Sequence, residues 1–301
     1  MRLVARIGPK ASVGIVIIGA VAVLAIFAPL IAPYGSEQVL GAVLQPPSWD
    51  HPFGTDPRGM DIFSRTVFAP RQDLTIGLVA TLFAFAIGVP LGALAGMYEG
   101  RGRIGGGMSQ LIMRGMDVLQ SFPVFVFALA LVAVLGPGAT NLTLGLVFVN
   151  APVFVRQVRT SVLIQRDAAF VEAAVVAGWG RLRIGFRHVL PNALGPSVAQ
   201  LSVTLGFTIL LTAGLSFVGA GVRLPTAEWG VMISDGAGQM ATGQWWPSVF
   251  PGASLAITVI GFSLIGEGLR ESMEERGSRL AFRSARGMHR ALLDAAAARR
   301  S

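Results

Sequence analysis

Few side chains in this 301-residue sequence are suited to catalysis, and those few are widely separated. The chain has no cysteine, which excludes disulfides, thiolate metal sites and cysteine nucleophiles together. His51, His188 and His289 form no pair at metal-ligand spacing, so no metal site is expected. The single lysine, Lys10, follows a Gly-Pro dipeptide, so a phosphate-binding GxxxxGK[ST] loop is impossible here. If ATP drives this protein, another polypeptide must bind the ATP.

The charged residues that do gather are suited to protein contacts. Between residues 165 and 192, Glu172 is followed by several arginines and a histidine. A helix over 167–177 is predicted to end near Gly178, where left-handed backbone is easily reached. A second short helix over 181–189 is predicted to stop near Pro191, which cannot donate a helical hydrogen bond.

This helix-turn-helix suits docking into a groove of a soluble protein. Ala173 and Ala174 would let a partner approach closely, and Glu172 would offer charge-assisted contacts. An ordinary basic loop, neutralised by lipid headgroups, is the alternative.

The composition indicates that membrane helices position these residues. Only 13% of the residues are charged and 53% are hydrophobic, with a mean hydropathy of +0.65. A soluble domain has about a quarter of its residues charged. The apolar residues also form long blocks, each near the length that crosses a bilayer as a helix. Six spans are predicted, at residues 13–33, 74–98, 109–135, 142–164, 193–218 and 248–269.

The distribution of basic residues predicts the orientation. With both termini inside, the cytoplasmic segments carry 20 of the 24 arginines and lysines, and the external segments carry 4. This placement explains the net charge of +8 by membrane topology, so no nucleic-acid partner is expected. The basic tail after residue 278 is either an amphipathic helix on anionic lipid or a frayed end.

The segment 165–192 resembles the EAA loop of permeases in binding-protein-dependent ABC transporters. The residues that carry this resemblance, in the family's order and spacing, are Glu172, Ala173, Ala174, Gly178, Leu190 and Pro191.

Further motifs narrow the resemblance to the dipeptide/oligopeptide/nickel subfamily and to its second type of permease subunit. The segment after the first span has the subfamily's GTD…GxD…SR pattern, carried by Gly54, Thr55, Asp56, Gly59, Asp61 and Arg65. Residues 113–123 match its MRxMD…FP stretch, and residues 215–221, 225–230 and 245–252 also fit. The resemblance covers roughly residues 10–272.

The resemblance implies an all-α type I ABC importer permease fold with six transmembrane helices and both termini cytoplasmic. It implies three regions: 1–72 with the first helix and an external loop, a permease core at 73–270, and a basic tail at 271–301. The protein would be a multi-pass protein of a bacterial or archaeal inner membrane.

The same resemblance implies a non-catalytic subunit that pairs with a second permease. Two cytoplasmic ATPases would carry ATP and magnesium, this chain would hold no cofactor, and an external binding protein would deliver the solute. The residues matching the EAA loop would contact the ATPase, with Arg187 and His188 as further candidates. A peptide is the first expectation for the solute, and nickel, an opine, glutathione or a sugar are the alternatives.

Two other classes of protein were weighed from the residues alone. A self-contained channel or secondary transporter should have charged groups inside its spans. Here charges lie only near span ends, where Arg114 with Asp117 and Glu267 with Arg270 are expected to form ion pairs three residues apart. A membrane enzyme is disfavoured because no nucleophile has a base at a useful spacing. Asp56, Arg58, Asp61 and Arg65 are expected to order the external loop or to meet the binding protein.

Overall fold

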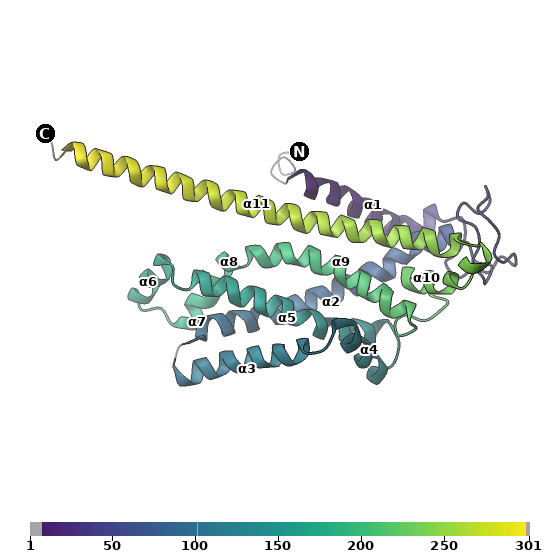
Figure 1. Cartoon of the computed structure of the whole chain (residues 1–301), viewed down its shortest axis with the longest axis horizontal. Helices are drawn as coiled ribbons and strands as arrows, with labels where there is room; N and C mark the ends of the chain where they lie inside the picture. The colour runs from purple at the N-terminus through teal and green to yellow at the C-terminus, as the bar shows by residue number, and fades with distance from the viewer. Residues whose placement is uncertain (1–7, 101, 299–301) are drawn as a thin grey trace.

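The computed structural model describes residues 8–100 and 102–298, and from residue 275 onward the course of the helix only. Long helices run side by side along the longest axis of the molecule (Figure 1). They are α1 (Pro9–Ile31), α2 (Ile62–Tyr98), α3 (Arg103–Gln120), α5 (Ala139–Gln165), α9 (Gly195–Phe217) and α11 (Trp246–Ala298), while the shorter α4 (Val124–Leu135) lies across this direction. Five are long and apolar enough to cross a membrane, and α3 with α4 makes a sixth span if the bent pair counts as one.

The short helices divide between the two ends of the bundle. Helices α6 (Ala169–Val176), α7 (Arg181–Ile184) and α8 (Leu190–Ala193) lie at the left of Figure 1, toward the side on which α11 runs to the C-terminus. Helix α10 (Trp229–Ala237) lies at the opposite end, with the loop between α1 and α2. The segments predicted to be cytoplasmic therefore share one end, and those predicted to be external share the other.

The third predicted span is not one straight helix. It is divided into α3 and α4, which are bent by 88° at residues 121–123. Pro123 has no N–H to continue the ladder and disfavours helical backbone at Phe122. Ser121 instead turns its hydroxyl back to the carbonyl of Val118 at 2.7 Å.

Two other spans begin or end far from the predicted boundaries. Helix α2 starts at Ile62 rather than near 74, because Asp61 caps it by accepting the backbone N–H of Ser64 at 2.7 Å. Helix α11 runs through Ala298 rather than ending near 269. The tail is therefore helical in its backbone. The predicted contacts of the tail with lipid concern side chains that the structure does not describe. Arg2 and Arg6, in the N-terminal segment predicted to be cytoplasmic, also lie outside the described residues.

Helix α2 packs against α5 through three glycines spaced four residues apart. Added Cβ atoms on Gly88, Gly92 and Gly96 would come within 2.5 to 2.8 Å of atoms of α5. Small residues at this spacing let two backbones approach closely, which is how helices gain packing energy in lipid. The two helices therefore form one rigid unit along the core of the bundle.

Arginines of α5 also close the cytoplasmic end of α2. Arg166, the C-cap residue of α5, donates to the carbonyls of Gly96 and Glu99 at 2.9 and 2.8 Å. These two carbonyls lie at the end of α2 and have no helical N–H left to accept. Arg159 forms a two-point ion pair with the Glu99 carboxylate. Cations at a helix C-terminus also oppose its dipole.

At the other end, α1 is held to α2 by an arginine that replaces a missing donor. Pro29 cannot donate to the carbonyl of Ala25, four residues earlier. Arg71 of α2 supplies hydrogen bonds to the carbonyls of Ala25 and Ile26, at 2.5 and 2.9 Å. The Arg71 side chain thereby satisfies backbone carbonyls that α1 leaves open.

A Gly92→Val substitution should lower the thermal stability of the purified protein by about 1 to 3 kcal/mol, the usual cost of overpacking. The new Cβ would meet the Val155 carbonyl oxygen at 2.5 Å and the Val158 Cβ at 2.9 Å. Gly106→Val in α3 is the matched control, because a Cβ there meets nothing within 4 Å. Equal melting temperatures for both variants would contradict the close packing of α2 on α5.

Candidate functional site

The segment between α5 and α9 folds as a short helix followed by a compact turn at the cytoplasmic end. Helix α6 ends in a Schellman motif: Trp179 N–H donates to the Ala174 carbonyl at 3.1 Å, and Gly178 N–H donates to that of Val175 at 2.9 Å. This ending requires Gly178 to adopt φ +80°, as its position in the sequence predicted.

The predicted stop near Pro191 is wrong. Helical backbone continues from Arg181 to Ala193 through α7, a π-helical turn at Gly185–Val189 and α8. Leu190 N–H donates to the carbonyl of Gly185, five residues back, so the hydrogen-bond register widens just before the proline. Pro191 then takes a first-turn position in α8, where its missing N–H costs nothing.

One face of this element is buried against the bundle. Val171, Ile184, Val189 and Leu190 pack in a cluster with Met97 of α2 and with residues of α5. Ala174 packs against the same cluster from α6. The element is therefore attached to both helices of the central unit, and Leu190 serves that attachment rather than an exposed contact.

The opposite face of α6 is exposed and partly apolar. Val176 is 89% exposed and Val175 57% exposed, beside the exposed Ala173. The Glu172 carboxylate is also exposed and forms no hydrogen bond or ion pair with the part of the chain that is described. In water such a surface marks a contact site.

Of the remaining candidate residues in this segment, some are exposed at the surface and one packs within the segment itself. Arg187 and Pro191 are exposed. The His188 ring packs on the Trp179 ring, with centroids 4.8 Å apart, and Arg183 covers the same tryptophan at 4.3 Å. His188 Nε2 is buried without a partner among the described residues. The structure therefore does not bring Arg187 or His188 to Glu172.

At the external end, the predicted loop residues form a buried polar network. Asp61 is fully buried, lies 3.0 Å from His51 Nδ1, and caps α2. Asp56 accepts the N–H groups of Arg58 and Met60 at 2.9 and 2.8 Å. Burial raises the pKa of Asp56, although these N–H bonds and the Arg65 charge act in the opposite direction.

The same network joins the loop to other helices. Arg65 is 1% exposed, and its Nε lies 3.7 Å from Asp56. Gly54 takes φ +77° against the Trp246 ring, and Trp246 Nε1 donates to the Thr55 carbonyl at 3.3 Å. Gly59 takes φ +75° in the turn after Asp56. These residues therefore order the loop, and Arg58 extends the network to Asp235 of α10 at 3.3 Å.

Sequence reasoning missed one pair of buried acids, although Asp73 stands out as a charge within an apolar stretch. Asp73 of α2 and Glu228 before α10 are both fully buried, and their carboxyl groups lie near one another. Asp73 Oδ2 accepts the N–H of Trp229, while Oδ1 has no hydrogen-bond partner among the described residues. Two carboxylates buried side by side repel one another when both are ionised.

Glu228 also caps α10 by accepting the N–H groups of Gly230 and Val231 at 2.9 and 2.7 Å. Burial nevertheless raises the pKa of Glu228 above its ordinary value. Asp73 of α2 and Glu228 therefore both accept N–H groups from the first turn of α10, which ties α2 to α10 at the external end.

The two ion pairs expected within single helices are not formed among the described residues. Asp117 of α3 pairs instead with Arg156 of α5, at 2.7 Å. Glu267 lies 3.8 Å from Lys10 of α1, which approaches Glu271 more closely at 2.6 Å. A neighbouring helix supplies the partner in both cases, so these charges fasten helices to one another.

A body of membrane-length helices with a short helical segment exposed at one end is the architecture of an ABC importer permease subunit. Comparison with family models agrees: residues 88–278 match the binding-protein-dependent transport system inner membrane component, and residues 9–47 match the N-terminal TM domain of oligopeptide transport permease C. The chain belongs to the family of binding-protein-dependent transport system inner membrane components. It is thus a multi-pass inner-membrane protein of the bacterial type.

Curated relatives and a solved structure support this placement. The dipeptide transport system permease protein DppC of Alkalihalophilus pseudofirmus is 39% identical over 267 residues, covering 88% of this chain and 86% of the relative. The probable D,D-dipeptide transport system permease protein DdpC of Escherichia coli is 38% identical, covering 87% and 86%. A chain of the inward-facing MetNI methionine ABC transporter superposes with a TM-score of 0.57 at 19% identity, covering 69% of this chain and 96% of that one. This likeness shows the type I permease fold.

An Asp73→Asn substitution should raise the melting temperature at pH 8 and change it little at pH 5. Burial raises the folded-state pKa of Glu228, so stability falls as pH rises from the unfolded pKa through the folded one, where Glu228 ionises beside Asp73. An asparagine removes one of the two carboxylates that would then repel each other, and its carbonyl still accepts from Trp229.

Thermal unfolding in detergent at both pH values measures this effect. Asp73→Leu is the control, because it removes the charge but leaves the Trp229 N–H without an acceptor, at a cost of about 1 to 3 kcal/mol. An asparagine variant that is less stable than the wild type at pH 8 would contradict repulsion between the two buried carboxylates.

Proposed function

We propose that this chain is one of two permease subunits that together form the membrane pathway of an importer for dipeptides or other short peptides. The relatives named for dipeptide transport are 38–39% identical over most of the chain, and this observation carries the choice of solute. A second, related permease completes the pathway, and an external solute-binding protein delivers the peptide.

Two cytoplasmic ATPases drive the cycle and hold ATP and magnesium, because this chain has no phosphate-binding loop. The exposed face of α6 is the docking surface: Val175 and Val176 would enter a cleft of the ATPase, and Glu172 would face a donor there. ATP binding shifts the transporter between conformations only through a difference in affinity for them. The buried face of α6–α8 carries that movement to α2 and α5.

The external binding protein would meet the rim of the α1–α2 loop rather than its buried acids. Trp49 is fully exposed there, and Val43 is 57% exposed. Asp56, Asp61 and Arg65 hold this rim in shape from beneath.

Reconstitution in liposomes tests the function directly. The complete complex should take up radiolabelled dipeptide only with ATP, and this chain alone should take up none. ATP-independent uptake by the chain alone would support the channel or secondary-transporter alternative. ATP-dependent uptake of nickel, an opine, glutathione or a sugar, with no uptake of peptide, would retain the ABC permease and reject the peptide assignment.

Substitutions in α6 test the docking surface. Glu172→Lys should weaken co-purification with the ATPases by about tenfold or more, because a charge-assisted contact is lost. Gly178→Val should uncouple ATP hydrolysis from uptake, because φ +80° is strained for a β-branched residue. Gly178→Asn is the matched control, since asparagine tolerates this conformation. Membrane insertion should be normal in all three. Unchanged ATPase binding and transport in the lysine and valine variants would reject the docking role.

A further inference from the structure

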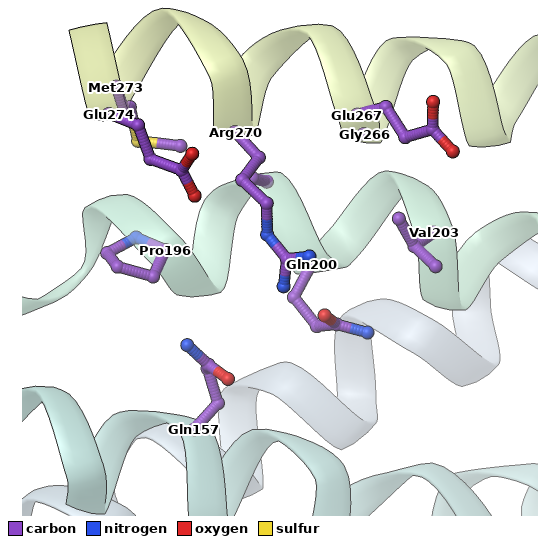
Figure 2. A pocket seen from close by; sticks show the side chains of 10 residues that line it. Gln157, Pro196, Gln200, Val203, Gly266, Glu267, Arg270, Met273 and Glu274 are labelled. Carbon is purple, nitrogen blue, oxygen red and sulfur yellow. The ribbon is translucent and has the colours of Figure 1, made fainter.

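A cavity of about 330 Å³ opens between α5, α9 and α11 (Figure 2). It lies in the cytoplasmic half of the molecule, since α5 enters the docking element eight residues after Gln157 and α9 begins at Gly195. The volume is within the range of small-molecule sites, about 300 to 1,000 Å³.

Polar side chains from three helices face this cavity. Arg270 extends from α11 toward Gln200 of α9, and Gln157 points into the same space from α5 (Figure 2). Glu274 lies one helical turn after Arg270 and also lines the cavity. Met273 and Val203 supply apolar wall.

These groups are largely free to bind a ligand. Arg270, Glu274 and the Gln157 amide form no hydrogen bond or ion pair with other described residues. Gln200 makes one long bond, to the Thr204 hydroxyl at 3.3 Å. Glu267 also lines the cavity, but it lies 3.8 Å from Lys10 and is partly neutralised.

The charges select the chemical class of the ligand. One uncompensated cation and one uncompensated anion face the cavity, so a phosphate would be repelled by Glu274 and a simple cation by Arg270. A zwitterion satisfies both. The two glutamine amides each offer a donor and an acceptor, which complement the N–H and C=O of a peptide bond.

The spacing of the charges suits a short peptide. Arg270 and Glu274 are four residues apart on one helix, a rise of about 6 Å along one face. Two extended residues span about 7 Å. A dipeptide can therefore place its carboxylate at Arg270 and its ammonium group at Glu274.

We propose that this cavity is a contact site for the transported peptide at the cytoplasmic end of the pathway. Arg270 binds the C-terminal carboxylate, Glu274 binds the N-terminal ammonium group, and Gln157 and Gln200 bind the backbone. This assignment rests on the proposed function in peptide import. Such a site must bind weakly, because a transport pathway has to release its solute.

Photocrosslinking in the complete, nucleotide-free complex tests the site. The photoreactive amino acid p-benzoylphenylalanine takes the place of Met273, and radiolabelled Ala-Ala is the probe. Labelling of this chain is expected. Unlabelled Ala-Ala should compete at a concentration about tenfold lower than Ala-Ala amide or N-acetyl-Ala-Ala, because each blocked peptide loses a charge-assisted contact.

Charge variants identify the two ends. Arg270→Gln should reduce labelling by free Ala-Ala about tenfold and abolish the preference for a free carboxylate. Arg270→Lys should retain most of the labelling and most of that preference, because lysine keeps the positive charge. Glu274→Gln should abolish the preference for a free ammonium group. Arg114→Gln is the matched control, since Arg114 is exposed on α3 and does not line the cavity. ATP hydrolysis without peptide should be unchanged in this control.

Three outcomes would overturn the assignment. Mass spectrometry of the crosslinked product would identify phosphatidylethanolamine instead of peptide if a zwitterionic lipid headgroup occupies the cavity. Absence of crosslinking in a complex that imports Ala-Ala would reject the cavity and leave the proposed function intact. A wild-type complex that imports no peptide would reject both.

Discussion

Close packing of α2 on α5 is the constraint on which the rest of this permease depends. In lipid there is little hydrophobic drive to bring helices together, so contact must come from shape and from satisfied polar groups. The glycines of α2 allow backbone approach, and Arg166 then reaches the open carbonyls at the end of α2. The two effects reinforce one another, because the arginine reaches those carbonyls only when the helices lie this close.

This central unit has a different task at each end. Externally, α2 begins in the network around Asp61 and is joined to α10 through Asp73 and Glu228. On the cytoplasmic side, α5 leads into the segment α6–α8, in which the π-helical turn packs on α2 and α8 packs on α5. A displacement of this segment must therefore move α2 and α5 together, since bending either helix would break contacts within a close-packed cluster.

The sequence predicted the spans well, because hydropathy and the placement of arginines depend on composition. The break at Phe122-Pro123 escaped prediction because an apolar run looks the same whether it is straight or bent. The early start of α2 escaped because hydropathy detects lipid-facing residues and not capping by Asp61. The predicted helix end near Pro191 was wrong because a π-helical turn precedes the proline. The turn places Pro191 in the first turn of α8, where its missing N–H is not needed. Resemblance selected the segment 165–192 as a candidate, but only the structure separates buried Leu190 from exposed Glu172.

The two halves of the molecule differ in how their polar groups are satisfied. The external half buries its charged groups: His51 with Asp61, Asp56 with Arg65, and Asp73 beside Glu228. In the cytoplasmic half, the pairs Lys10–Glu271 and Asp117–Arg156 are exposed, and Arg270 and Glu274 stand open to a cavity. Buried pairs are costly to break, because separating one partner leaves an uncompensated charge. Any movement that opens the external side must therefore carry these buried groups as intact units, and the change in packing must fall on contacts without a buried charge.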